Sequence, residues 1–150
     1  MAQELRTARY WVAAIAFGQI AATVVKLVLQ RPRPLADLYD GLSTYAFPSG
    51  HATMSMVAYG FLATLIAGQF DRPHRWMVYA VATLLISVIA ASRLYLSAHW
   101  LSDVIGGLSL GLTWVCLLAI AYHRHPVSAP PPRGLLGVGL LAFTLAADGT

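Results

Sequence analysis

Charged groups and cysteine are scarce in this sequence of 150 residues. Charged residues make up 11% of the chain, and only six of them are acidic. An ordinary soluble domain carries about a quarter charged residues, so this class is excluded, together with disordered chains and coiled coils. The single cysteine, Cys116, has no partner for an intramolecular disulfide or for a cysteine metal site. The basic residues are too scattered to form a nucleic-acid-binding face.

Long apolar blocks dominate the sequence. Hydrophobic residues make up 58% of the chain, and its mean hydropathy is +0.65. Four blocks cover approximately residues 10–29, 51–70, 76–91 and 100–122. Each is near the length of about 20 residues that a helix needs to cross a bilayer. None shows the two-residue alternation of a membrane barrel. We therefore predict an all-α membrane bundle with four spanning helices.

The connections suggest a division of the chain into two parts. Residues 1–125 hold the four blocks and form the predicted membrane domain. Within it, residues 30–50 make a connection rich in proline and glycine that is long enough to be functional. Residues 126–150 are predicted to be a proline-rich linker followed by a short apolar tail, 134–147, which is short for a membrane span.

The distribution of basic residues predicts the orientation. Basic residues in short connections favour the cytoplasmic side of a membrane. We therefore expect the N-terminus in the cytoplasm of a bacterial-type inner membrane. Six arginines fall on the N-terminal side: Arg6, Arg9, Arg72, Arg75, Arg124 and Arg133. Two arginines, Arg31 and Arg33, fall on the opposite side, and Lys26 and Arg93 lie near helix ends on that side.

Polar and ionisable residues gather on the predicted outer side. Such groups are costly within or beside membrane helices, and are therefore functional candidates. Lys26, Arg33 and Arg93 provide three positive charges that suit a phosphate group. Ser49 is a candidate N-cap, and Gly50 lets the backbone amides at that helix start approach an anion closely. These residues predict a phosphate-binding site.

Two histidines and an aspartate supply groups for phosphoryl transfer. We expect His99 and Asp103, four residues apart, to lie on one helix face. The carboxylate can then keep one imidazole nitrogen protonated and leave the other free as a nucleophile. His51 remains as the proton donor to the departing oxygen.

Simpler roles exist for several of these residues. Lys26 at a helix end can extend to the lipid headgroups. Arg31 is interpreted as a headgroup contact rather than a catalytic group. The spacing of Gly107 and Gly111 favours close packing of helices over a dimer face.

Together the candidates resemble a known three-part motif. Lys26 and Arg33-Pro34 form its first part, residues 48–51 (PSGH) its second, and residues 92–103 (SR-x5-H-x3-D) its third. They resemble the motif of the type 2 phosphatidic acid phosphatase (PAP2) family, which shares its site with vanadium haloperoxidases. All eleven specified residues are present in order.

The resemblance implies a role for each position. It implies that His99 attacks phosphorus and forms a phosphohistidine, that Asp103 assists it, and that His51 protonates the leaving group. It also implies that the phosphate is bound without a metal or other cofactor. Five residues would hold the phosphate oxygens: Lys26, Arg33, Ser49, Gly50 and Arg93.

The membrane members of this family usually have six helices, with the motifs on the last four. This chain is therefore expected to represent the core of that fold without its first two helices, which leaves room for fused or partner membrane helices.

The function expected from these observations is metal-independent hydrolysis of a membrane-anchored phosphomonoester or diphosphate on the outer face of the membrane. Undecaprenyl diphosphate, phosphatidylglycerol phosphate and phosphatidate are the candidate substrates. A non-catalytic phospholipid-binding membrane module of a larger protein is the alternative from a different class. A vanadate-dependent haloperoxidase is disfavoured, because those enzymes are soluble.

Overall fold

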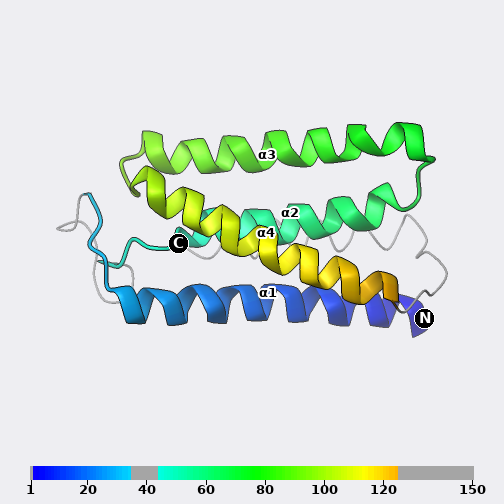
Figure 1. Cartoon of the computed structure of the whole chain (residues 1–150), viewed down its shortest axis with the longest axis horizontal. Coiled ribbons are helices and arrows are strands. Elements are labelled where there is room, and N and C mark those ends of the chain that lie inside the picture. Colours follow the sequence, from blue (N-terminus) through cyan, green and yellow to red (C-terminus); the bar gives the residue numbers. More distant parts are fainter. Residues whose placement is uncertain (1, 35–43, 125–150) are drawn as a thin grey trace.

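The structure is a computed structural model that describes residues 2–34 and 44–124. Its elements are α1 (Ala2–Leu29), α2 (Gly50–Ala67), the short 3-10 helix η3 (Arg72–His74), α3 (Arg75–Tyr95) and α4 (Leu101–Arg124) (Figure 1). Within the described ranges the only strand-like pairing is an isolated bridge between Pro32 and Tyr45. The predicted all-α class is confirmed. The predicted linker and tail, 126–150, lie outside the described residues.

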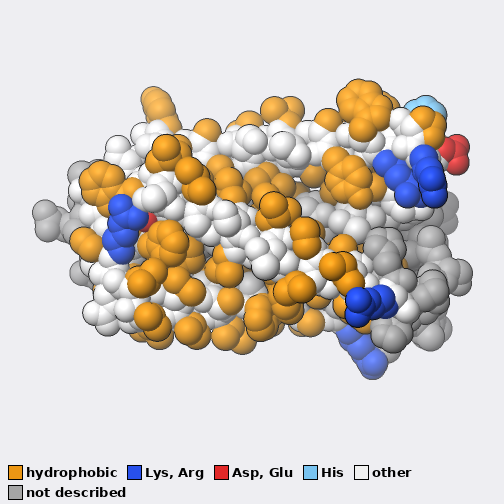
Figure 2. Space-filling model, in the orientation of Figure 1, with side chains coloured by type: hydrophobic (Ala, Val, Ile, Leu, Met, Phe, Trp, Pro, Cys, Tyr) orange, Lys and Arg blue, Asp and Glu red, His pale blue; other side chains and the backbone are white. Residues whose placement is uncertain are grey.

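The four long helices have the length and composition of membrane spans. Each is apolar enough to cross a bilayer, and the spans run over Arg9–Leu29, Gly50–Ala67, Arg72–Tyr95 and Leu101–Tyr122. Hydrophobic side chains cover the middle of the visible face, whereas lysines and arginines lie toward its two ends (Figure 2). Such a surface matches hydrocarbon in the middle and headgroups or water at both ends. The chain is an integral membrane protein.

Helix α2 is the centre of the bundle, and it packs against α1, α3 and α4. Half of its span is buried within the protein, whereas 17% of the α1 span and 11% of the α3 span are buried. Trp11 of α1, Phe61 of α2 and Val115 of α4 belong to one core cluster. Because α2 is held on three sides, its first turn has a well-defined position relative to the neighbouring helix ends.

Glycines bring α4 into backbone contact with α2. A Cβ atom on Gly107 would lie 2.6 Å from the carbonyl oxygen of Ser49, and one on Gly111 would lie 2.8 Å from that of Thr53. Real side chains do not tolerate such distances. The predicted role of the Gly107–Gly111 spacing in close helix packing is therefore confirmed, and the packing is within one chain.

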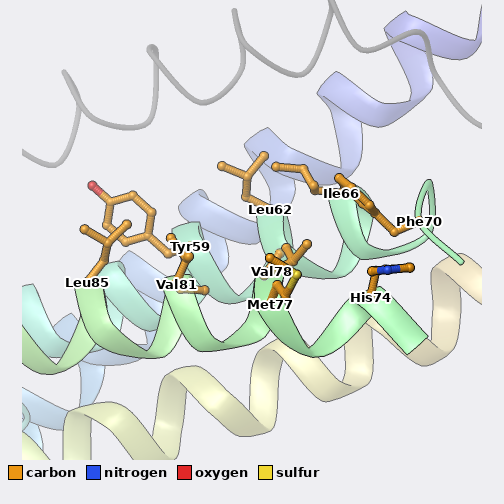
Figure 3. Close-up of a pocket in the computed structure, with 11 residues that line it drawn as sticks. Tyr59, Leu62, Ile66, Phe70, His74, Met77, Val78, Val81 and Leu85 are labelled. Atoms are coloured by element: carbon orange, nitrogen blue, oxygen red, sulfur yellow. The ribbon is translucent and has the colours of Figure 1, made fainter. Parts of the chain in front are cut away.

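An apolar groove lies between α2 and α3, toward the end of the bundle that carries η3 (Figure 3). Its volume is about 350 Å³. None of the predicted site residues lines it. The lining residues are Tyr59, Leu62, Ala63, Ile66, Phe70, His74, Met77, Val78, Val81, Ala82 and Leu85.

Candidate active site

The predicted site residues come from four segments at the opposite end of the bundle, which is on the left in Figure 1. These segments are the last turn of α1 with residues 30–34, residues 44–49 with the first turn of α2, the last turn of α3, and residues 96–100 with the first turn of α4. Helices that alternate in direction bring these ends together, as the sequence predicts. The residues placed there are Lys26, Arg33, Ser49, Gly50, His51, Arg93, His99 and Asp103.

His99 is buried, with 4% of its surface exposed, and one of its ring nitrogens faces an arginine. Nη1 of Arg33 lies 3.2 Å from Nε2 of His99, and it also donates to the carbonyl oxygen of Ala98 at 3.0 Å. A guanidinium can only donate hydrogen bonds, so Nε2 of His99 must be the acceptor in this contact. The neutral ring then carries its proton on Nδ1.

The surroundings of His99 favour the neutral imidazole. Burial is the largest effect, and the positive charges of Arg33 and Lys26 add to it, so that the pKa of His99 falls to about 3. A neutral imidazole with a free pair of electrons on Nε2 has the form that a nucleophile requires.

Asp103 lies beside the other nitrogen of this ring. Its side chain is fully buried, and Oδ2 is 3.7 Å from Nδ1 of His99. Nδ1 has no hydrogen-bond partner in this arrangement. Oδ2 instead accepts a hydrogen bond of 2.8 Å from the backbone N–H of Trp100.

The structure corrects the prediction that His99 and Asp103 lie on one helix face. Helix α4 begins at Leu101, so His99 lies in the preceding turn rather than on one helix face with Asp103. The turn contains Ser97, whose φ of 52° is in the left-handed region. The Asp103 carboxylate caps the start of α4 by accepting the free N–H of Trp100, which belongs to no helical hydrogen bond. The Asp103 carboxylate thus both caps α4 and faces the imidazole of His99.

Ser49 joins the start of α2 to the start of α4. As predicted, it is the N-cap of α2, and its Oγ accepts from the N–H of Ala52 at 3.5 Å. Its own N–H donates to the carbonyl oxygen of Asp103 at 2.9 Å. A Cβ atom on Gly50 would meet nothing within 4 Å, so there is open space beside this helix start. Backbone N–H groups at a helix N-terminus favour an anion in such a space.

Lysine and arginine side chains surround the same region. Nζ of Lys26 donates to the carbonyl oxygen of Tyr45 at 3.0 Å, and Nε of Arg93 donates to Oγ of Ser92 at 3.3 Å. Arg93, Arg33 and Lys26 all lie close enough to His51 for their charges to act on its imidazole. The three cations, the α2 N-terminus and both histidines thus belong to one electropositive site.

One residue of this site had been interpreted differently from the sequence. The sequence predicts a headgroup contact for Arg31, whereas in the structure its Nη1 forms an ion pair of 2.9 Å with Oδ1 of Asp103. The sequence feature that indicates this contact is the position of Arg31 two residues before Arg33. In extended backbone, residues two apart share a side, so both arginines can face the same neighbour.

The family model of the PAP2 superfamily matches residues 7–126 of the chain. The chain belongs to the PAP2 superfamily. The match covers all four membrane spans and every residue of the site. No solved structure gives a significant match to the chain.

Several curated proteins that are similar to the chain are named as phosphatases. The chain is 35% identical over 91 residues to phosphatidylglycerophosphatase B of Bacillus subtilis, which covers 59% of this chain and 45% of that protein. It is 30% identical over 114 residues to undecaprenyl-diphosphatase of Sulfolobus acidocaldarius (73% and 50%). It is 30% identical over 145 residues to lipid A 1-phosphatase of Rhizobium etli (93% and 55%). The chain thus spans about half the length of these relatives.

Proposed function

We propose that this protein is a metal-independent lipid phosphate phosphatase that works through a phosphohistidine on His99. The observation that carries the proposal is the contact between Nη1 of Arg33 and Nε2 of His99. It places the guanidinium of Arg33, which can bind a phosphate group, beside Nε2 of His99, which can attack phosphorus. The PAP2 family and its phosphatase relatives support the same reaction class.

The proposed reaction has two steps. In the first, Nε2 of His99 forms a bond to the terminal phosphorus while the bond from that phosphorus to the departing oxygen breaks. The departing oxygen is the lipid oxygen of a phosphomonoester or the bridging oxygen of a diphosphate. His51 gives its proton to that departing oxygen. In the second step, water attacks phosphorus, His51 accepts a proton from the water, and the P–N bond breaks to release inorganic phosphate.

The remaining residues bind the phosphate group. Lys26, Arg33 and Arg93 offset its negative charge, and the hydroxyl of Ser49 and the backbone N–H of Gly50 donate to its oxygens. Before it can bind the phosphate, Arg33 must move off Nε2, where it lies in the present arrangement. The phosphate would then occupy the open space beside Gly50.

The proposed substrate class is a membrane-anchored phosphomonoester or diphosphate. The relatives are named for phosphatidylglycerol phosphate, undecaprenyl diphosphate and lipid A, which share a phosphate group on a lipid. The site lies at an end of the bundle, where a headgroup would be, and apolar helix surfaces extend below it. The charge distribution supports the outer face of a bacterial inner membrane as the location of the site.

Phosphate release by the purified full chain tests this function. The protein in detergent is given undecaprenyl diphosphate, phosphatidylglycerol phosphate and phosphatidate separately, in excess EDTA. We expect release from at least one lipid, and loss of that release in His99→Gln. Glutamine fills much of the buried space, so the variant should stay folded, and a melting curve verifies this.

Three results would contradict the proposal. Release that EDTA abolishes would require a metal. Release that persists in His99→Gln would remove the phosphohistidine. If folded wild-type protein binds these lipids but releases no phosphate, the non-catalytic phospholipid-binding module becomes the better interpretation.

A further inference from the structure

Arg31 is bound to the start of α4 through its side chain. Its Nη1 donates to Oδ1 of Asp103 at 2.9 Å and to Oγ of Ser102 at 2.6 Å. The Arg31 side chain is 40% exposed, whereas that of Asp103 is fully buried. Nη1 of the partly exposed Arg31 therefore contacts a carboxylate that is buried from solvent.

The two oxygens of this carboxylate have different partners. Oδ1 accepts from Arg31, and Oδ2 accepts from the backbone N–H of Trp100. Two hydrogen bonds to opposite oxygens fix the rotation of the carboxylate about its Cβ–Cγ bond. In that rotation Oδ2 is the oxygen that faces Nδ1 of His99, at 3.7 Å.

Arg31 also supplies the positive charge in direct contact with this buried carboxylate, whereas the charge of Lys26 acts on it without an ion pair in the described residues. Within the described residues, the ion-pair partners of Asp103 are Arg31 and His99. The neutral form of His99 provides no countercharge, so the positive charge in the pair comes from Arg31. A buried carboxylate that loses its partner is strongly destabilised, and it must take up a proton or turn toward solvent.

The backbone around Arg31 is tied to α4 as well. Nε1 of Trp100 donates to the carbonyl oxygen of Pro32 at 3.2 Å, and the Arg31 guanidinium lies 6.0 Å from the centre of the Trp100 ring. The segment after α1 therefore contacts the turn before α4 with two arginines. Arg31 reaches Asp103 at one end of the aspartate–histidine pair, and Arg33 reaches Nε2 of His99 at the other.

We propose that Arg31 is a positioning residue: it holds the Asp103 carboxylate in the rotation that turns Oδ2 toward Nδ1 of His99, and it does not bind the substrate phosphate. The negative charge of Oδ2 then supports the Nδ1 proton that the contact of Arg33 with Nε2 also favours. The consequence for turnover rests on the proposed function. The consequence for the protonation of His99 does not, because it concerns the protein without substrate.

The experiment compares the wild-type chain with Arg31→Met, Arg31→Lys and Arg72→Met. Methionine keeps much of the length of arginine without its charge or donors. Lysine restores a charge that can reach one carboxylate oxygen. Arg72 is an exposed arginine of η3 at the other end of the bundle, so Arg72→Met is the matched control. For each purified protein, kcat and KM for phosphate release and a melting curve are measured, and ¹⁵N NMR reports which nitrogen of His99 carries the proton.

We expect Arg31→Met to lower kcat by about 10- to 100-fold with KM changed less than about twofold, the pattern of a lost interaction that acts on the reaction step rather than on binding. Arg31→Lys should recover part of kcat, and Arg72→Met should match wild type. The NMR spectrum should show the proton on Nδ1 in the wild type and a mixture of tautomers in Arg31→Met.

Three results would overturn the inference. A raised KM with unchanged kcat would make Arg31 a substrate ligand. Wild-type kcat in Arg31→Met would remove any role in turnover. An unchanged His99 tautomer in Arg31→Met would remove the positioning role even if the wild-type protein shows no phosphatase activity. If Arg31→Met does not fold, the same comparison is made with Arg31→Lys, for which an unaltered kcat and tautomer would again contradict the inference.

Discussion

At the scale of single residues, the burial of His99 is the feature with most consequence. The ring is enclosed between the turn before α4, Arg33 and Asp103, and its pKa is lowered to about 3. The neutral form of the imidazole is thereby favoured at neutral pH. The same burial shows that His99→Ala would leave a cavity, so glutamine is the better test of function.

This pKa predicts a loss of stability in acid. An unfolded chain protonates His99 near pH 6.5, whereas the folded protein resists protonation until about pH 3. The unfolded state therefore binds more protons below pH 6.5, and the free energy of unfolding falls as the pH falls through this window.

We expect a contribution of order 1–2 kcal/mol between pH 7 and pH 5. Melting curves of wild type and His99→Gln at both pH values measure it, and wild type should lose more stability than the variant. Equal losses in the two proteins would show that His99 does not titrate in this way.

At the scale of elements, the contact of α2 with α4 places the phosphate-binding backbone beside the histidine–aspartate pair. Ser49 hydrogen-bonds the backbone of Asp103, and Gly107 lies against the carbonyl of Ser49 one turn further along α4. The distance between the two helices therefore also controls the position of His99 relative to the α2 N-terminus.

Gly107→Ala should separate the two helices. Its Cβ would lie 2.6 Å from a backbone oxygen, which cannot move aside as a flexible side chain can. We expect destabilisation of about 1–3 kcal/mol, together with a lower kcat. Thermal melting and phosphate release measure the two effects.

Gly60→Ala is the matched control, because the atoms nearest to its Cβ would be those of the side chains of Val115, at 3.4 Å, and Met56, at 3.6 Å. This variant should be at least as stable as wild type, since alanine is the better helix former. A Gly107→Ala protein as stable and active as Gly60→Ala would show that the contact has no structural role.

At the scale of the whole molecule, the chain is an apolar bundle with polar groups at both ends. The end with the site carries both histidines of the proposed reaction, and the other end carries η3 and the apolar groove (Figures 1 and 3). The candidate site and the apolar groove therefore lie at opposite ends of the bundle.

Orientation can be tested with two cysteines in a Cys116→Ala background. Leu96 is exposed in the turn between α3 and α4, and Gln69 is exposed in the turn before η3. In intact bacterial cells, a membrane-impermeant maleimide should label Leu96→Cys but not Gln69→Cys, because the positive-inside rule places the Gln69 turn in the cytoplasm. Permeabilised cells, in which both should react, are the control. The reverse pattern would place the site on the cytoplasmic face.

Local sequence was sufficient for the membrane helices and for most of the site. Hydropathy and length determine which segments cross a bilayer, so the four helices were predicted within a few residues at most ends. The type of each polar residue and its place at a helix end also predicted the gathering of Lys26, Arg33, Ser49 and Asp103. These properties depend on residues close together in the chain.

Three-dimensional packing decided the rest. Which guanidinium meets the Asp103 carboxylate depends on how the segment after α1 lies against α4, 72 residues away along the chain, and Arg31 and Arg33 are equally basic. The start of α4 likewise follows from the hydrogen bond between Asp103 and Trp100, which leaves His99 in a turn. Charge and hydropathy do not encode these choices, because they depend on the relative positions of helix ends that only the packed bundle defines.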